Sequence, residues 1–179
     1  MNPKYPRKQA KRIQNQLWQM DLKYGYIAGI DRFFFIMSII DVYDRCIVGY
    51  HIGLSALALD ALTTLRQAIL LRGVTDPDKL ILRTDNPRNS PPNAFQDGCA
   101  ELPVNHTHVP NNTANMNAHI ESFHSILESD CLSRHEFHSY AKAYKCVNEF
   151  MDYYNHRRRH GSLKNKVPMA FTAVLLTEI

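Results

Sequence analysis

The chain lacks any apolar stretch of the length that a membrane-spanning helix requires, which is about 18 residues or more. Its longest apolar segment, residues 33–40, has only the length of a strand. No apolar segment follows the basic residues near the N-terminus, so we expect no secretory signal peptide. Internal repeats and low-complexity segments are absent as well. Together these absences predict a globular protein with no membrane partner, and we expect it in the cytoplasm.

Cysteine is scarce, and its spacing excludes the common zinc motifs. Cys46, Cys99, Cys131 and Cys146 are widely separated and form no Cys-x-x-Cys pair, so a zinc ribbon is unsupported. We therefore expect reduced thiols, as is usual in the cytosol. His106 and His108 would point to the same face of an extended segment. They are compatible with a metal-binding pair, but a structural or surface role is the favoured interpretation.

Length and charge indicate one domain with basic ends. At 179 residues, with 45% hydrophobic and 21% charged side chains, the chain can build one substantial core. Residues 1–12 and 153–166 each carry five basic side chains and no acid, whereas residues 13–152 hold 11 basic and 16 acidic ones. Basic ends around an acidic centre suit a polyanionic partner. The alternative is a solvated tail and a solvated helix end.

Apolar periodicity predicts an alternation of strands and helices. Expected strands cover residues 16–26, 33–42, 46–52, 79–83 and 104–109, and residues 25–31 form a hairpin turn. Expected helices cover residues 55–72, a short segment from 91 to about 102, a segment starting near 117, and 140–154. Ser55 and Asn117 are candidate N-caps. Gly73 is the expected C-terminal stop of the first long helix.

Three carboxylates occur in recognisable contexts. Asp21 ends the segment at residues 17–21, Asp85 follows the apolar strand at 79–83, and Glu121 lies in the helix that begins near 117. The same residue types are common at turns and in the first turn of helices, where each would have a purely structural reason. Between Asp85 and Glu121 there are 35 residues. The pattern resembles the D,D-35-E triad of retroviral integrases and related insertion-sequence transposases.

The resemblance extends over residues 15–171. It includes the pair of segments at 40–45 and 47–49, and a closing pattern formed by Tyr154, Asn155, Arg158, His160 and Leu163. It implies an α/β, ribonuclease-H-like fold with a five-stranded mixed sheet flanked by helices. Residues 1–14 would then be a basic arm and residues 172–179 a C-terminal tail. Because the helix-turn-helix that usually precedes such a core is not seen, the chain looks like a core taken from a longer recombinase.

The resemblance also implies a mechanism. Asp21, Asp85 and Glu121 would be both the catalytic residues and the ligands of two Mg²⁺ or Mn²⁺ ions, which in such sites lie about 3.5–4 Å apart. The expected activity is cleavage of double-stranded DNA at transposon ends and strand transfer into target DNA by a homo-oligomer. The expected DNA-binding residues are Arg157, Arg158, Arg159, Lys164 and Lys166. The alternatives are a ribonuclease-H-like nuclease that only hydrolyses, and a DNA-binding or assembly module that has lost catalysis.

Three positions depart from the family pattern. Pro87 stands where glycine usually follows Asn86, and proline fixes φ and removes a donor, so this loop must have a different shape. Met116 occupies a position that is often acidic. Glu128, seven residues after Glu121, replaces a lysine that usually faces DNA. An acidic side chain repels phosphate, so we expect weaker DNA contact at Glu128.

Overall fold

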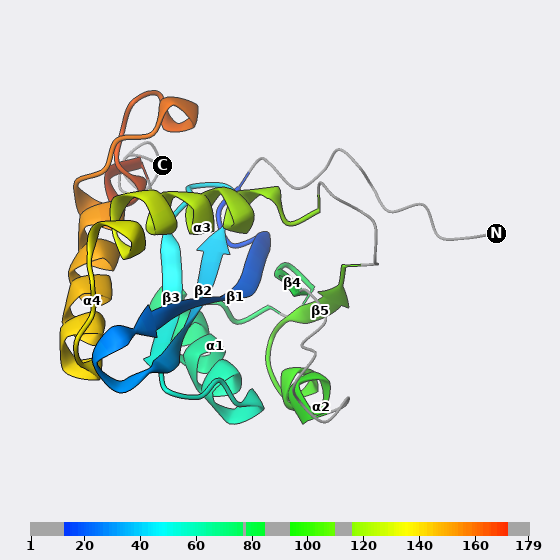
Figure 1. The fold of residues 1–179 in the computed structure, drawn as a ribbon. Coiled ribbons are helices and arrows are strands. Elements are labelled where there is room, and N and C mark those ends of the chain that lie inside the picture. Colours follow the sequence, from blue (N-terminus) through cyan, green and yellow to red (C-terminus); the bar gives the residue numbers. More distant parts are fainter. Residues whose placement is uncertain (1–12, 77, 85–93, 110–115, 172–179) are drawn as a thin grey trace.

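The computed structural model describes residues 13–76, 78–84, 94–109 and 116–171 and shows a sheet between two layers of helices (Figure 1). The strands are β1 (Leu17–Ile27), β2 (Arg32–Asp41), β3 (Ile47–Gly53), β4 (Ile81–Thr84) and β5 (Asn105–His108). The helices are α1 (Ala58–Arg72), α2 (Ala94–Ala100), α3 (Ala118–Asp130) and α4 (Tyr140–His156). Short 3₁₀ turns are η1 (Ala28–Ile30), η2 (Leu132–Arg134) and η3 (Gly161–Leu163).

The sheet is mixed, as expected from the sequence. Its strand order is β3-β2-β1-β4-β5. β1 pairs antiparallel with β2 and parallel with β4, which itself pairs parallel with β5. In this register Asp21 lies opposite Ser38 of β2, and the neighbouring Met20 lies opposite Thr84, the last residue of β4. β1 is therefore the central strand on which the antiparallel and parallel halves of the sheet meet.

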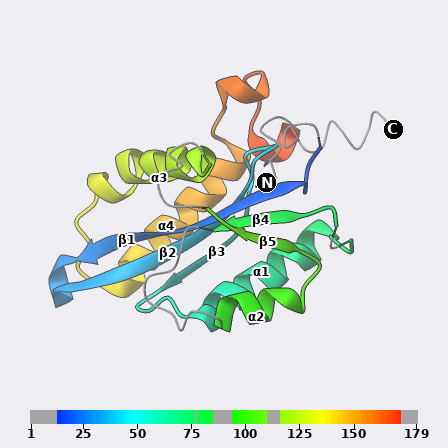
Figure 2. The ribbon, with the colours of Figure 1, turned by 90° about the vertical axis from the view of Figure 1, so that its right-hand side faces the viewer.

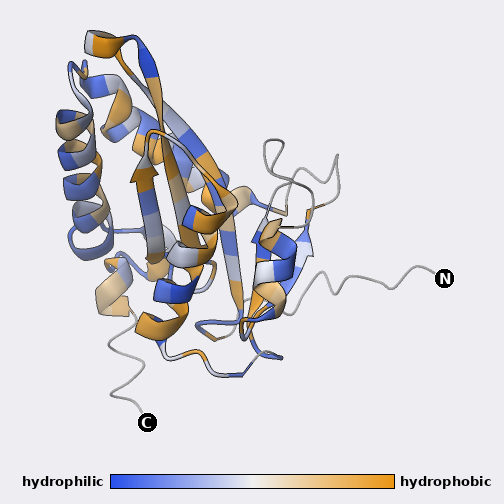
Figure 3. Cartoon of the chain, turned by 90° about the horizontal axis from the view of Figure 1, so that it is seen from below, coloured by the Kyte–Doolittle hydropathy of each residue, from blue (hydrophilic) through white to orange (hydrophobic). Residues whose placement is uncertain are grey.

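Helices cover both faces of the sheet (Figure 2). Trp18 and Met20 of β1 belong to the core that includes α1 and α2. α3 and α4 pack on the opposite face, over Phe34, Ile36 and other residues of β2. Because successive side chains of a strand point to opposite faces, the face of β1 that carries Gln19 and Asp21 is the one toward α3. Hydrophobic residues run along the central strands between the helical layers (Figure 3).

The expected N-cap of α1 was wrong, whereas its expected C-terminal end is confirmed. Ser55 is not the N-cap, because α1 begins at Ala58 with Leu57 in the capping position. The backbone N–H of Leu57 donates to Asp60 Oδ2 at 2.9 Å, so a side chain inside the first turn satisfies this end. Gly73 does end the helix, with φ of 62°, a conformation that glycine adopts without steric cost.

Other boundaries differ from the expectations by a few residues. The hairpin turn is present as η1 followed by Asp31, whose φ is 48°. The short helix α2 starts at Ala94, and Pro91 and Pro92 lie outside the described residues. Most of the proposed arm at 1–14 and all of the tail at 172–179 also lie outside them. None of the helices in the described ranges is long and apolar enough to cross a lipid bilayer.

Candidate active site

Asp21 lies on the face of the central strand that α3 covers. Its Oδ1 accepts a hydrogen bond from the backbone N–H of Leu22 at 2.8 Å. Its Oδ2 lies 3.4 Å from Nδ1 of His124, a residue of α3. The Asp21 side chain keeps 30% of its surface exposed. An ionised carboxylate offers about four acceptor sites, so Asp21 retains capacity for a further partner.

A buried glutamine fixes the start of α3 against β1. The amide nitrogen of Gln19 donates to the carbonyl of Met116 at 2.7 Å, and its amide oxygen accepts the N–H of Ile120 at 3.0 Å. Asn117 occupies the N-cap position, as expected, but its side chain makes no capping hydrogen bond. Gln19 therefore satisfies an N–H of the first turn of α3 that would otherwise lack a partner. This tertiary cap sets where Glu121 stands relative to Asp21.

Glu121 lies in the first turn of α3, three residues before His124, so both side chains lie on the same side of the helix. Glu121 is exposed and makes no ion pair or side-chain hydrogen bond within the described ranges. Together with Lys23, His124 and Glu128 it lines a shallow hollow of about 640 Å³. Asp21 and Glu121 thus flank His124, which brings them to one region of the surface.

Asp85, the third predicted carboxylate, lies outside the described residues. The strand before it is described, and its final residue Thr84 pairs with Met20. β4 therefore ends beside the residue that precedes Asp21. Whether Asp85 completes a triad stays a prediction.

The two described carboxylates are suitable ligands for a hard divalent cation. Magnesium prefers oxygen donors and keeps several waters, so one or two carboxylates are enough for each ion. No lysine or arginine in the described ranges forms an ion pair with Asp21 or Glu121. Among the described residues, the side chain of Asp21 has the ring of His124 and the N–H of Leu22 as its partners. The donor chemistry of this region therefore fits Mg²⁺ or Mn²⁺.

His124 is a residue of this site that sequence reasoning missed. It is buried with 8% of its surface exposed, and its Nε2 has no hydrogen-bond partner in the described structure. The ring also packs against Phe123, with centroids 5.7 Å apart. Its spacing of three residues from Glu121 was the one sequence feature that could have indicated a place beside the site. A histidine on an amphipathic helix gives no further indication that it will face a strand carboxylate.

Glu128, beside the hollow, forms an ion pair. Its Oε2 lies 2.8 Å from Nζ of Lys23, which follows Asp21 by two residues on the same face of β1. Lys23 thus offsets the acidic charge that replaces the usual lysine.

The closing pattern of the chain is tied to the fold. Asn155 accepts from the N–H of Ile47 and donates to its carbonyl, both at 2.9 Å, and so fastens α4 to β3. Tyr154 is buried against Phe123, with ring centroids 4.8 Å apart in an edge-to-face arrangement. His160 is also buried and packs on Tyr154. Burial, followed by repulsion from Arg158, lowers the pKa of His160 to about 4.

The five predicted DNA-binding cations are in different environments. Arg157 pairs with Asp152 at 3.2 Å and lies over the ring of Tyr153, and Arg158 lies 3.7 Å from Asp130. Arg159 and Lys164 are exposed, and Lys166 is half-buried. All five follow the end of α4 at His156.

The two other groups noted in the sequence also have local roles. The rings of His106 and His108 lie side by side on β5, 4.5 Å apart, as alternation predicts. His106 Nε2 lies 2.8 Å from Thr84 Oγ1, and burial lowers the pKa of His106 to about 4. These contacts support the structural interpretation. All four cysteines are free, but Cys131 and Cys146, which looked scattered, lie together in space.

Comparisons with known proteins agree with this arrangement. Two models described as integrase core domain match residues 11–113 and 102–168. The insertion element IS600 uncharacterized 31 kDa protein of Shigella sonnei is 30% identical over 165 residues, which are 90% of this chain. The chain spans only 58% of that relative's length.

Solved structures show the same fold. The HTLV-2 integrase catalytic core domain, in complex with magnesium and in a dimeric form, superposes with a TM-score of 0.61 and 15% identity, covering 88% of this chain and 95% of that one. The catalytic domain of Mos1 mariner transposase superposes with a TM-score of 0.57 and 15% identity, covering 77% and 70%. At such identities the likeness establishes the ribonuclease-H-like fold alone.

Proposed function

Because this chain belongs to the integrase core domain family, we propose that it is the catalytic core of a DNA transposase of a bacterial insertion sequence. It would cut one DNA strand at a transposon end and join the freed 3′-hydroxyl to target DNA. The observation that carries the proposal is that Asp21 and Glu121 flank His124 on one face of the sheet.

Asp21, Glu121 and Asp85 are the proposed ligands of two Mg²⁺ or Mn²⁺ ions. When bound, such ions activate the attacking oxygen and stabilise the charge of the leaving one. The protein's part is to hold the carboxylates at fixed positions, because phosphoryl transfer depends mainly on alignment and charge neutralisation. The rigid central strand positions Asp21, and the Gln19 clamp positions the helix turn that bears Glu121.

His124 is a proposed positioning residue for Asp21. Its Nδ1 faces Asp21 Oδ2, which restricts the rotation of the carboxylate and leaves its remaining lone pairs for a further partner. Double-stranded DNA is the proposed partner, and the proposed assembly is a homo-oligomer, as for the dimeric HTLV-2 domain. The chain's share of the IS600 relative leaves room for end recognition elsewhere in a longer protein.

A strand-transfer assay tests the proposal. A labelled duplex with a free 3′-hydroxyl end is incubated with the 179-residue chain, target DNA and Mn²⁺, and joined products are resolved on a denaturing gel. We expect joined products with the wild type and none with Glu121→Gln, which removes a ligand charge at nearly constant size. Asp97→Asn, an exposed acid on α2, is the matched control and should retain activity.

Each other result assigns a different function. Metal-dependent cleavage without any joined product would identify a nuclease that only hydrolyses. DNA binding without cleavage, unaffected by Glu121→Gln, would identify a binding or assembly module. Equal loss in Glu121→Gln and Asp97→Asn would mean that the assay does not report on the proposed site.

A further inference from the structure

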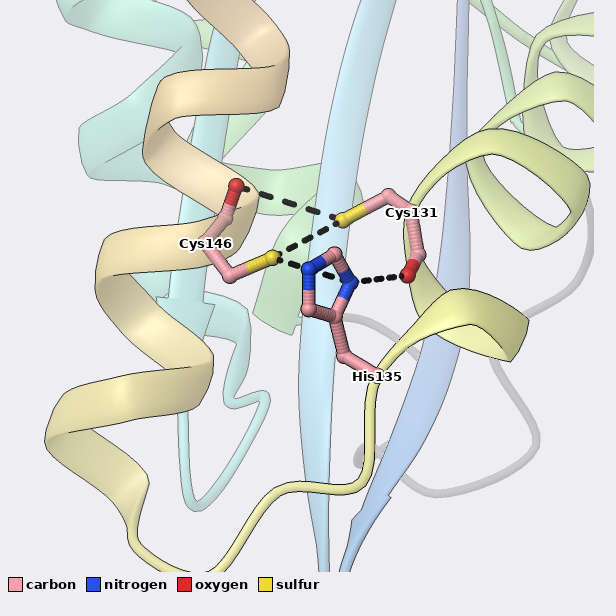
Figure 4. A group of neighbouring side chains, drawn as sticks. All are labelled: Cys131, His135 and Cys146. Atoms are coloured by element: carbon pink, nitrogen blue, oxygen red, sulfur yellow. Dashed lines mark hydrogen bonds between the residues drawn. The ribbon is translucent and has the colours of Figure 1, made fainter.

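Three soft-metal donors meet at the far end of α3 from Glu121. Cys131 is the C-cap of α3, His135 follows η2, and Cys146 lies on α4 (Figure 4). Their donor atoms all lie within 4.8 Å of one another. In the described ranges, no other group of three or more His, Cys, Asp or Glu side chains comes this close. Ten residues of helix separate Cys131 from Glu121, which is about 15 Å, so the cluster is not part of the carboxylate site.

Two of the three donor–donor distances are close to the edges of a tetrahedral metal site. The two Sγ atoms are 3.5 Å apart, and Cys146 Sγ is 3.5 Å from His135 Nδ1. With Zn–S bonds of about 2.3 Å and Zn–N bonds of about 2.0–2.1 Å, tetrahedral angles give S···S and S···N edges of roughly 3.8 and 3.6 Å. The third pair, Cys131 Sγ and His135 Nδ1, lies within 4.8 Å, and a turn of the exposed His135 side chain would close that edge around an ion.

The imidazole is held with Nδ1 toward the sulfurs. Nδ1 lies 2.8 Å from the carbonyl of Cys131, and the ring stacks on Phe137 at a centroid distance of 5.9 Å and an interplanar angle of 16°. Metal ligation needs the lone pair of Nδ1, so the hydrogen bond to the Cys131 carbonyl must break, the ring must turn further toward the sulfurs, and the proton is then carried by Nε2. His135 is exposed, which allows solvent to accommodate that proton.

We propose that Cys131, His135 and Cys146 bind one Zn²⁺ ion through two thiolates and one imidazole nitrogen. The fourth position is left to water, because Cys146 is only half-buried and His135 is exposed. Such an ion fastens the end of α3 to the middle of α4. The inference does not depend on the proposed transposition chemistry.

Binding exchanges two thiol protons for the ion: Zn²⁺ and two S–H groups give two Zn–S bonds and two released protons. Without metal, burial and the contact with Cys146 hold the pKa of the Cys131 thiol well above its ordinary value. The site therefore competes with protons, and its affinity for zinc must increase with pH.

Cobalt spectroscopy of the reduced 179-residue chain tests the site. Co²⁺ is added without oxygen and in the presence of a phosphine reductant. We expect one equivalent to produce a thiolate-to-cobalt charge-transfer band and the intense visible bands of tetrahedral Co²⁺, both removed by Zn²⁺. Carboxylate oxygens cannot give the thiolate band, so Co²⁺ at Asp21 or Glu121 does not interfere.

Variants locate the signal. Cys146→Ser should abolish the band, whereas Cys99→Ser, a buried cysteine in the opposite core, should keep it. His135→Ala changes an exposed residue and so spares the core, and it should weaken Co²⁺ affinity at least tenfold. Zn²⁺ should raise the melting temperature of the wild type and Cys99→Ser only. A folded, reduced wild type without the band, or an unchanged affinity in His135→Ala, would overturn the proposal.

Discussion

At the scale of single residues, Gln19 is the link between the central strand and the helix that bears Glu121. Its buried amide forms hydrogen bonds on both sides of the N-cap of α3, to Met116 and to Ile120. A polar side chain in this position is costly to bury unless both ends of the amide are satisfied, and here they are. This side chain therefore ties the start of α3 to β1.

Gln19→Leu should lower the free energy of unfolding by roughly 1–3 kcal/mol, because the main-chain N–H of Ile120 is left without a partner. The carbonyl of Met116 keeps a contact with Arg83 at 3.5 Å. Urea denaturation measures the change. Gln67→Leu, an exposed glutamine of α1, is the matched control and should stay within about 0.5 kcal/mol of the wild type. A loss below about 1 kcal/mol in Gln19→Leu would mean that water replaces the amide.

Asp21→Asn should abolish metal-dependent DNA cleavage while the fold stays intact, because the substitution removes a ligand charge and keeps the side chain's size. Cleavage of a labelled duplex and the melting temperature are measured on the same preparation. Cleavage at the wild-type rate would show that Asp21 is not a ligand. A large fall in melting temperature would instead assign Asp21 a structural role beside His124.

At the scale of elements, β1 and α3 share charge across the hollow. Lys23 of the strand and Glu128 of the helix are partly exposed, so their pair contributes at most about 1 kcal/mol to stability. The pair matters for the charge of the hollow. Lys23 supplies the cation that a bound polyanion would meet there, and Glu128 neutralises it.

Glu128→Lys should therefore strengthen DNA binding with little change in stability. Fluorescence anisotropy over a range of salt concentrations should show a slope steeper by about 0.9 for each additional phosphate that the protein neutralises. Glu149→Lys, on the exposed face of α4, makes the same charge change away from the hollow. If Glu149→Lys strengthens binding equally, the effect reports net charge and not proximity to the hollow.

The segment after α4 provides the second electrostatic prediction. Replacing Arg157, Arg159, Lys164 and Lys166 together by glutamine should weaken DNA binding regardless of sequence and lower the salt slope by about 0.9 for each phosphate that is no longer neutralised. Arg158 is left in place because it belongs to the closing pattern of the family and is partly buried near Asp130. The matched control replaces four exposed cations elsewhere: Arg66, Lys79, Lys142 and Lys145. If the quadruple glutamine variant is folded and its salt slope is unchanged, the four cations do not contact phosphate and the segment is a solvated helix end.

The elements also show what a sequence can predict. The order of strands and helices follows from the local sequence pattern. The apolar run at residues 33–40 predicted β2, and Gly73 predicted the C-terminal end of α1. The N-cap of α1 was placed wrongly because Asp60 satisfies the helix end from inside the first turn. Asp21 and Glu121 were predicted as site residues from a family pattern, and their role stays a prediction. The Gln19 clamp and the meeting of Cys131 with Cys146 were not, because long-range packing leaves no local signal.

At the scale of the whole molecule, a buried acidic network joins the β2–β3 turn to α1. Asp44 is fully buried and pairs with Arg72 at 2.9 Å. Asp41, also buried, accepts the N–H groups of Asn15 and Tyr43. Burial, and then repulsion from Asp44, raises the pKa of Asp41 from 3.8 to about 6. Removing one member of a buried ion pair costs about 3–5 kcal/mol, so Arg72 is essential to this network.

Asp41 should make global stability depend on pH. Its pKa is higher in the folded state, so the native chain binds more protons between about pH 4 and 6, and stability falls as pH rises through that window. Relative to Asp41→Asn, which cannot titrate, the wild type should lose roughly 1–3 kcal/mol between these limits. Urea denaturation at several pH values measures the difference. A constant difference would contradict the raised pKa of Asp41.

The Gln19–Ile120 hydrogen bond spans 101 residues of chain. During synthesis on the ribosome, β1 and β2 emerge and can pair long before α3 exists. A nascent or prematurely terminated chain therefore displays Asp21 without Glu121, His124 or the clamp that orders them. The DNA cleavage proposed for this protein would therefore be impossible until translation has passed α3.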